Sequence, residues 1–195
     1  MKTAFIIHGF NGDTLYTFGP WLKNELIKRD YNVIMPEFPI RSEATYYTWS
    51  SILNNFISTF DNDTIIICHS IGNPFIIKYL SSNNLKAKLY ISVAGFCDLF
   101  TVPDRDDLNK AFVDFQVDSK NIEYCKNTIP YRYSLYSDND HVIPIDILKN
   151  FVLQLNSTGV FISGVGHMGN RNNIHNLPQI TKILDDVLKN NEVNI

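Results

Sequence analysis

The sequence is poor in cysteine and has no paired-cysteine motif. Its 195 residues include three cysteines, Cys68, Cys97 and Cys125, an odd number at scattered spacings. None of them forms a C-x-x-C pair, so neither a disulfide framework nor a zinc knuckle is indicated. A reducing, cytoplasmic compartment is therefore the default expectation.

Charge and hydropathy also lack extremes. The 17 Lys and Arg and the 20 Asp and Glu give a formal net charge of −3, and the isoelectric point is near 5.9. Without a basic block, the chain has no electrostatic footprint for a nucleic-acid partner. No apolar run approaches the roughly 18 to 20 residues of a membrane span, which argues against a membrane partner. The apolar stretch Met1–Phe10 is too short and too interrupted for a signal peptide.

The composition that remains is that of an ordinary globular protein. Hydrophobic residues make up 45% of the chain, charged residues 19% and aromatic residues 13%. These values argue against disorder and against a coiled coil. A chain of this length fits one compact domain that builds its own core. We therefore expect residues 1–195 to form a single domain.

Short apolar runs alternate with amphipathic stretches along the chain. The strand candidates are the apolar runs Thr3–His8, Asn32–Pro36, Thr64–Cys68, Lys88–Val93, Tyr131–Tyr136 and Val160–Ser163. The predicted helices are Pro20–Arg29, Ala44–Phe60, Asn73–Leu80, Ile145–Leu155 and a C-terminal helix marked by Leu177, Ile180 and Leu184. This alternation implies parallel strands joined by right-handed crossovers. We predict an α/β fold, a three-layer α/β/α sandwich around a mainly parallel six-stranded sheet.

The alternation breaks once, between Gly95 and Pro130. This stretch is mixed in pattern and holds two polar clusters, Asp104–Asp107 and Asp118–Glu123. We interpret it as an irregular, cap-like insertion around residues 96–129 on the rim of the sheet. An insertion this short leaves no room for a large lid, so a shallow site open to water is expected.

A candidate nucleophile follows the third predicted strand. The sequence there is Cys68-His69-Ser70-Ile71-Gly72, the small-x-Ser-x-small pattern of a nucleophile elbow. Such an elbow is a tight, strained turn from strand to helix, and it requires small residues two positions either side of the serine. Ser70 would present its hydroxyl at the start of the next helix, where the helix dipole favours a developing anion. The alternative is a serine that only caps that helix.

A hydroxyl nucleophile needs a base and an orienting carboxylate, expected later in the chain in the order serine, acid, histidine. His167 follows the last predicted strand between glycines, which lets its loop reach over the sheet edge. His141 and His175 are rival bases, and both are expected in exposed loops. His69, inside the elbow, is interpreted as packing beside the nucleophile.

The acid is expected in the polar loop after the strand that ends at Tyr136. Asp140 begins a D-x-x-I-P arrangement that ends at Pro144, in which the apolar residue and the proline fix the loop. Asp138 is the alternative, and Asp140 is favoured on this motif alone. Cys97 is a rival nucleophile after the fourth strand, although a small buried residue explains it more simply.

Acyl transfer also needs two preorganised N–H donors for the oxyanion. The backbone N–H of Ile71, directly after the serine, is one candidate. The loop after the first strand supplies the other, for which Phe10 is the best candidate because glycines flank it. Phe10, Phe96 and Met168 are the predicted substrate-binding side chains, and each could equally pack in the core.

Together, these residues resemble the α/β-hydrolase superfamily, and the short chain is similar to the small serine hydrolases related to retinoblastoma-binding protein 9. The resemblance covers nearly the whole chain and rests on His8-Gly9, Ser70, Asp140 before Pro144, His167, the stretch Phe18–Pro36, the helix with Trp49 and the segment Phe112–Glu123. It implies a minimal α/β-hydrolase fold and a cytosolic type of enzyme. The mechanism expected of these residues needs no cofactor or metal. Two departures are Cys68 in place of the usual glycine and the absence of the L-x-C-x-E motif, so no retinoblastoma partner is carried over.

The sequence therefore predicts a serine hydrolase that cleaves small acyl esters through Ser70, His167 and Asp140, with a small molecule as its partner. A thioesterase, peptidase or acyltransferase on the same residues remains open. So does a hydrolase-fold protein that binds a ligand without turnover. The oligomeric state is left undetermined.

Overall fold

The computed structural model describes residues 2–169 and 172–189. The predicted single domain, residues 1–195, includes positions outside these described residues. Its centre is a six-stranded sheet in the order β2-β1-β3-β4-β5-β6, and every pairing is parallel. The strands are β1 (Thr3–Ile7), β2 (Asn32–Ile34), β3 (Ile65–His69), β4 (Leu89–Val93), β5 (Tyr131–Tyr136) and β6 (Thr158–Phe161). Every residue of β1, β3 and β4 is buried, as a sheet covered on both faces requires.

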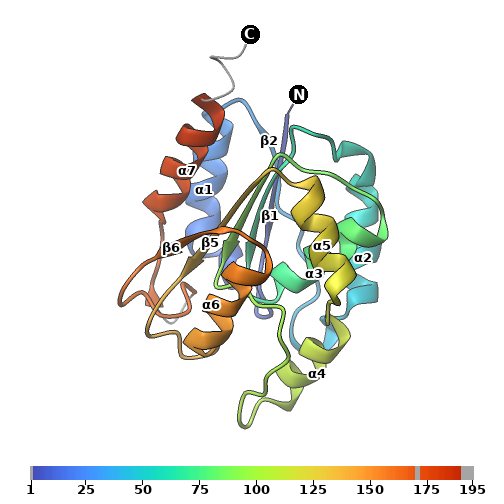
Figure 1. The fold of residues 1–195 in the computed structure, drawn as a ribbon, viewed down its shortest axis with the longest axis vertical. Coiled ribbons are helices and arrows are strands. Elements are labelled where there is room, and N and C mark those ends of the chain that lie inside the picture. Colours follow the sequence, from blue (N-terminus) through green and yellow to red (C-terminus); the bar gives the residue numbers. More distant parts are fainter. Residues whose placement is uncertain (1, 170–171, 190–195) are drawn as a thin grey trace.

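Helices cover both faces of this sheet (Figure 1). They are α1 (Phe18–Ile27), α2 (Tyr46–Leu53), α3 (Gly72–Ser82), α4 (Asp106–Asp114), α5 (Ser119–Thr128), α6 (Ile145–Gln154) and α7 (Pro178–Lys189). One hydrophobic cluster joins α1 and α7 to the sheet, and another joins α2, α3, α5 and α6 to its other face. The predicted three-layer α/β/α fold is therefore confirmed.

The strand order reverses between β1 and β3, which are neighbours in the sheet. The chain leaves β1 toward α1 on one face and leaves β3 toward α3 on the other. The loops that follow the two strands therefore separate and leave a crevice at their carboxyl ends. In open parallel sheets, ligands bind at this switch point.

The predicted helix Ala44–Phe60 is shorter in the structure. α2 begins after Thr45, whose side chain forms a capping box with Thr48, and it ends at Leu53. A 3₁₀ helix, Asn54–Thr59, continues it. The side-chain amide of Asn55 donates to the carbonyl of Ile52 at 3.1 Å, and asparagines that bond to nearby backbone in this way favour helix ends over helix interiors.

The stretch 96–129 differs from its prediction as an irregular insertion, because it contains α4 and α5. Asp118 and Asn121 form a capping box at the start of α5, and α5 packs along α3. Phe112, Phe115 and Cys125 are buried in the same cluster as α3. Leu108, Ala111, Phe112 and Phe115 follow the i, i+3, i+4, i+7 spacing of a helix, and the two polar clusters of this stretch obscured that pattern. The α5 segment is thus an ordinary crossover helix between β4 and β5.

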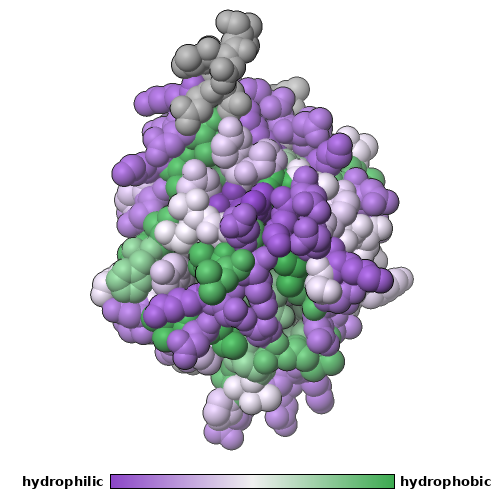
Figure 2. Space-filling model, in the orientation of Figure 1, coloured by the Kyte–Doolittle hydropathy of each residue, from purple (hydrophilic) through white to green (hydrophobic). Residues whose placement is uncertain are grey.

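The surface carries no single dominant apolar area on the face shown in Figure 2, where hydrophobic residues lie in small groups among hydrophilic ones. The most exposed large hydrophobic side chains are Tyr16, Tyr47, Val113 and Leu153. Within residues 2–169 and 172–189, none of the helices has the length and hydropathy of a membrane-spanning segment.

Candidate active site

Ser70 sits in a strained turn between β3 and α3. Its φ is 53°, in the left-handed region that side chains seldom adopt. The Ser70 N–H donates to the carbonyl of Val93 at 2.9 Å, and its own carbonyl accepts from the backbone N–H and the side-chain amide of Asn73 at 3.0 and 2.8 Å. These bonds hold the strained conformation.

The two small residues that flank the turn, Gly72 and Cys68, differ in their surroundings. A Cβ atom on Gly72 would lie 2.8 Å from the carbonyl oxygen of His8 and 2.9 Å from a side-chain carbon of Ile7. This position therefore excludes a side chain. Cys68 instead buries its side chain fully in the core, so the turn forms without a glycine there.

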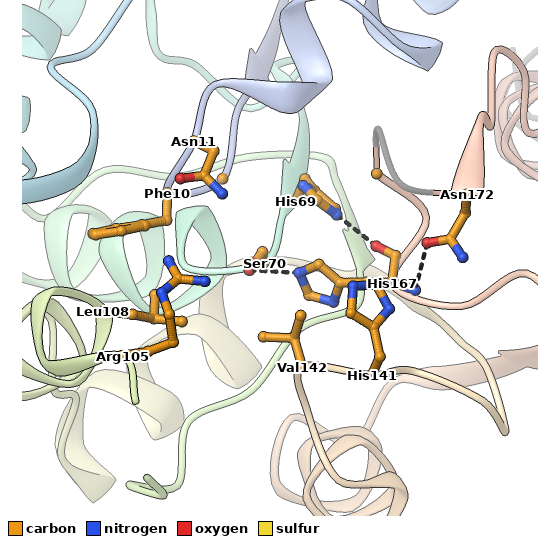
Figure 3. A pocket seen from close by; sticks show the side chains of 12 residues that line it. Phe10, Asn11, His69, Ser70, Arg105, Leu108, His141, Val142, His167 and Asn172 are labelled. Atoms are coloured by element: carbon orange, nitrogen blue, oxygen red, sulfur yellow. Dashed lines mark hydrogen bonds between the residues drawn. The ribbon is translucent and has the colours of Figure 1, made fainter. Parts of the chain in front are cut away.

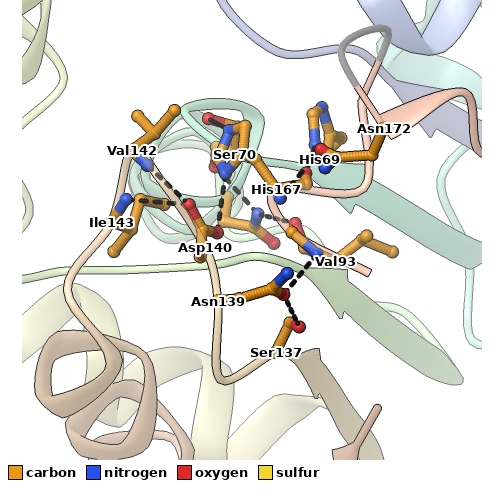
Figure 4. Close-up of polar contacts among 12 residues, drawn as sticks. His69, Ser70, Val93, Ser137, Asn139, Asp140, Val142, Ile143, His167 and Asn172 are labelled. Atoms are coloured by element: carbon orange, nitrogen blue, oxygen red, sulfur yellow. Dashed lines mark hydrogen bonds and ion pairs between the residues drawn. The ribbon is translucent and has the colours of Figure 1, made fainter. Parts of the chain in front are cut away.

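A chain of hydrogen bonds runs from the Ser70 hydroxyl to a buried carboxylate (Figure 4). His167 Nε2 lies 3.0 Å from Ser70 Oγ, and His167 Nδ1 lies 2.8 Å from Asp140 Oδ2. Asp140 Oδ1 accepts from the backbone N–H groups of Val142 and Ile143 at 2.8 and 2.9 Å. The Asp140 side chain is 1% exposed.

The pKa of Asp140 reflects opposing causes. Burial raises it, but the hydrogen bond and charge of His167 and the two backbone N–H groups outweigh burial and leave the pKa below its usual value. The carboxylate therefore stays ionised at neutral pH. An ionised acceptor fixes the Nδ1–H tautomer of His167, which leaves Nε2 as the basic nitrogen toward Ser70.

Asp138, the alternative acid, points elsewhere. It accepts from the Gly164 N–H at 2.9 Å and from the Ser163 hydroxyl at 2.8 Å. These two bonds hold its pKa below the usual value. Asn139 Oδ1 similarly accepts from the Gly166 N–H at 2.7 Å. Asp138 and Asn139 thus tie down the loop before His167, while Asp140 alone of these three contacts its ring.

The backbone of His167 is held from two sides, as Figure 3 shows. Its N–H donates to Asn172 Oδ1 at 3.1 Å, and its carbonyl accepts from His69 Nε2 at 2.8 Å. Burial, followed by the proximity of His167, lowers the pKa of His69 to about 3. His69 is therefore a neutral donor. It packs beside Ser70 as expected and also contacts the segment that carries His167.

The rival groups are placed away from this chain of bonds. His175 is exposed, and its ring bonds to Asn173 at 2.7 Å. His141 lines the pocket with its ring centre 6.1 Å from that of His167, on the side away from Ser70 in Figure 3. Cys97 is buried, and burial raises the pKa of its thiol well above the usual value. Such a thiol is a poor nucleophile.

The loop after β1 approaches the turn closely. A Cβ atom on Gly9 would lie 2.9 Å from His69 Nδ1 and 3.1 Å from Ser70 Cβ, so only glycine lets the backbone pass here. Among the residues that the structure describes, the backbone N–H groups of Phe10 and Ile71 have no hydrogen-bond partner. Two donors therefore remain available on either side of Ser70.

A pocket of about 80 Å³ opens over Ser70 and His167 (Figure 3). Of the three predicted substrate-binding side chains, only Phe10 lines it. Phe96 is 2% exposed and packs against Phe100 and Phe112. Met168 is fully buried in the core beside α1 and α7. Both side chains therefore pack in the core.

Five other lining residues are not among the predicted site residues. They are Asn11, Arg105, Leu108, Val142 and Asn172. Asn11 is adjacent to Phe10, and Val142 lies within the Asp140–Pro144 arrangement, so proximity to a motif is the only signal for these two. In the described part of the chain, no group of three or more His, Cys, Asp or Glu residues is arranged to hold a metal ion.

The parallel sheet, its reversal beside β3 and the strained serine turn define an α/β hydrolase fold. The chain belongs to the Serine hydrolase family, whose model matches residues 4–186. It is therefore a hydrolase.

Individual relatives are distant. The putative hydrolase YdeN of Bacillus subtilis (strain 168) is 25% identical over 186 residues, which span 94% of each chain. The crystal structure of the ydeN product superposes with a TM-score of 0.82 at 22% identity, over 97% of this chain and 100% of that one. Est1E from Butyrivibrio proteoclasticus, solved with ferulic acid bound, gives a TM-score of 0.68 at 15% identity, over 97% and 89% of the two chains.

A carboxylesterase structure from the archaeon Nitrososphaera gargenis gives a TM-score of 0.69 at 14% identity, over 100% of this chain and 92% of that one. At these identities, the structural likeness shows the fold that this chain shares with its relatives.

Proposed function

We propose that this hydrolase cleaves small acyl esters, with Ser70 as the nucleophile, His167 as the general base and acid, and Asp140 as the orienting carboxylate. The observation that carries the proposal is the chain of hydrogen bonds from Ser70 Oγ to His167 at 3.0 Å and from His167 to Asp140 at 2.8 Å. Both distances lie in hydrogen-bond range, and the first allows direct proton transfer from Ser70 to His167. The carboxylesterase among the structural relatives also favours an ester substrate.

The reaction follows from the proton positions. Ser70 Oγ attacks the ester carbonyl carbon while its proton passes to His167 Nε2. The resulting imidazolium is stabilised by ionised Asp140. Nε2–H then protonates the departing alcohol oxygen, which leaves an acyl group on Ser70. A water molecule then gives one proton to Nε2 while its oxygen attacks this acyl group. Nε2–H returns that proton to Ser70 Oγ as the bond between Oγ and the acyl carbon breaks, which releases the carboxylic acid and free Ser70.

The negative charge that forms on the carbonyl oxygen needs donors that are already in place. The N–H groups of Phe10 and Ile71, without partners among the described residues, are proposed as this oxyanion hole. Each such donor contributes roughly 10²–10³ in rate. Ile71 is also the N-cap residue of α3, so the positive end of the helix dipole lies nearby.

The pocket limits the size of the group that it can enclose. Its volume of about 80 Å³ is well below the roughly 300–1,000 Å³ of pockets for drug-sized ligands. A short acyl group is therefore proposed. The same proposal includes three further points. The chain forms one domain, its partner is a small molecule, and it is specifically similar to the hydrolases related to retinoblastoma-binding protein 9.

Labelling with a fluorophosphonate probe tests it. The wild-type protein is expected to be labelled at Ser70, while Ser70→Ala and His167→Ala are not. His175→Ala is the matched histidine control, because His175 is exposed and does not contact Ser70. A folded wild type without labelling would contradict the proposal and favour ligand binding without turnover. If labelling succeeds, short-chain esters, thioesters and peptides with one common acyl group identify the bond that is cleaved.

A further inference from the structure

We propose that the substrate carries a carboxylate group and that Arg105 binds it. This inference rests on the proposed function and names the substrate class of the same site. The starting observation is that Arg105 lines the pocket that holds Ser70 and His167. Arg105 lies in the segment that leads into α4, 35 positions from Ser70 in sequence, and no motif marks it.

The side chain of Arg105 is held in a defined place. Its guanidinium carbon lies 5.9 Å from the centre of the Phe10 ring, a distance at which a cation is attracted to an aromatic face. In Figure 3, the guanidinium group is turned toward Ser70, with Phe10 on one side and Leu108 on the other. The apolar neighbours reduce its contact with water, and its side chain is 35% exposed.

Arg105 keeps hydrogen-bonding capacity toward the pocket. Its Nε donates to Asp107 Oδ1 at 3.2 Å. Its two terminal nitrogens have no hydrogen-bond partner among residues 2–169 and 172–189. The terminal nitrogens of a guanidinium group together match the two oxygens of a carboxylate. Asp107 orients the arginine from outside, because it does not itself line the pocket.

The other lining residues do not compete for this charge. Among the described residues that line the pocket, none is Asp or Glu, and Arg105 is the one with a permanent charge. Asp140 lies behind His167, where it already accepts from that ring and from Val142 and Ile143. A substrate carboxylate in the pocket would therefore meet the terminal nitrogens of Arg105, while Asp107 pairs with Nε from outside the pocket. A single guanidinium group also balances one carboxylate charge better than the two charges of a phosphate.

Two matched pairs of esters test the proposal. Ethyl hydrogen succinate and ethyl butyrate share a four-carbon acyl group and the same alcohol, but only the first has a carboxylate. 4-Acetoxybenzoate and its methyl ester share the acetyl group and differ by a carboxylate on the leaving group. The kcat/KM of each ester is measured for wild type, Arg105→Gln, Arg105→Lys and Lys110→Gln. Lys110 is exposed on α4 and does not line the pocket, so it controls for loss of one positive charge on this segment.

The wild type is expected to prefer the charged member of at least one pair, and that pair shows which side of the ester faces Arg105. Arg105→Gln should lower the ratio of charged to neutral kcat/KM by about tenfold or more, as expected for loss of a charge-assisted hydrogen bond. Arg105→Lys should retain part of the ratio, and Lys110→Gln should leave it unchanged. Equal ratios in wild type and Arg105→Gln, in a protein that cleaves the neutral esters, would overturn the inference but leave the proposed function standing.

A binding measurement separates the two failures. The dissociation constants of ethyl hydrogen succinate and 4-acetoxybenzoate are measured calorimetrically for Ser70→Ala and for Ser70→Ala with Arg105→Gln. Weaker binding of at least one of them by about tenfold in the double variant supports the inference, even if no ester is turned over. Equal binding of both ligands overturns it without bearing on Ser70 as the nucleophile.

Discussion

The ring of His69 donates a hydrogen bond from Nε2 to the backbone carbonyl of His167 at 2.8 Å, between residues 98 positions apart. A carbonyl can only accept, so Nε2 carries the proton. The residue next to the nucleophile thus holds the segment that carries the proposed base. His69 acts through His167, and we infer for it a positioning role.

The first prediction concerns this contact. His69→Leu removes the donor and leaves the buried carbonyl of His167 unpaired, at a cost of about 1–3 kcal/mol. We expect kcat to fall by roughly tenfold with little change in KM, since the pocket surface is mostly kept. His69→Gln supplies an amide donor and should restore much of kcat. Steady-state kinetics on one short-chain ester measure both values. Equal loss in the two variants, or a change in KM alone, would contradict the positioning role.

The same histidine predicts how stability depends on pH. The pKa of His69 falls from 6.5 to about 3 on folding, first through burial and then through the nearby His167. Between these values the unfolded chain binds a proton that the native state does not, so stability falls as pH falls, and the loss is complete below about pH 3. From pH 7.5 to pH 5 the loss from His69 should be about 2 kcal/mol.

His69→Gln lacks this titration. Urea unfolding of both proteins at several pH values should therefore show the wild type losing about 2 kcal/mol more than the variant between pH 7.5 and pH 5. Other groups titrate alike in both proteins and cancel in the difference. Parallel stability curves over this range would mean that His69 is not held neutral by the fold.

Two neighbouring aspartates give the third prediction. Asp140→Asn should reduce turnover by roughly 10⁴, because a neutral amide fails to fix the tautomer and charge of His167. Asp138→Asn, two positions away, should instead loosen the loop through Ser163 and Gly164 and cost stability more than turnover. Kinetics and thermal unfolding of both variants separate these effects. Normal turnover in Asp140→Asn with an inactive Asp138→Asn would reverse the assignment of the acid.

The fourth prediction compares the two small positions of the serine turn. Gly72→Ala places a methyl group 2.8 Å from the carbonyl oxygen of His8, so backbone must move. We expect a loss of about 1–3 kcal/mol of stability, together with reduced labelling of Ser70 by a fluorophosphonate. Cys68→Ala only removes a sulfur atom from the core and should keep the labelling rate. If Gly72→Ala labels as fast as wild type, the turn tolerates a shift that the structure excludes.

The sequence alone predicted much of the architecture. Apolar runs too short for helices indicated parallel strands, and all six strands lie within a few residues of the predicted ranges. The residues of the serine turn could also be recognised in the sequence, because a strained turn limits which side chains fit around Ser70. Ser70, Asp140 and His167 each follow the end of a predicted parallel strand. The hydrophobic periodicity locates those strands, so it also located the three residues in their order along the chain.

Contacts between distant segments were decided only by the tertiary structure. Asp138 and Asp140 are alike in sequence, and the direction of the loop determines which one meets His167. Phe10 and Phe96 both follow strands, yet one lines the pocket and the other packs against Phe100 and Phe112. Arg105 carries no motif and reaches the pocket only through the path of the chain before α4. Local sequence determines which elements form, but the side chains that meet are determined by packing among segments far apart in the chain.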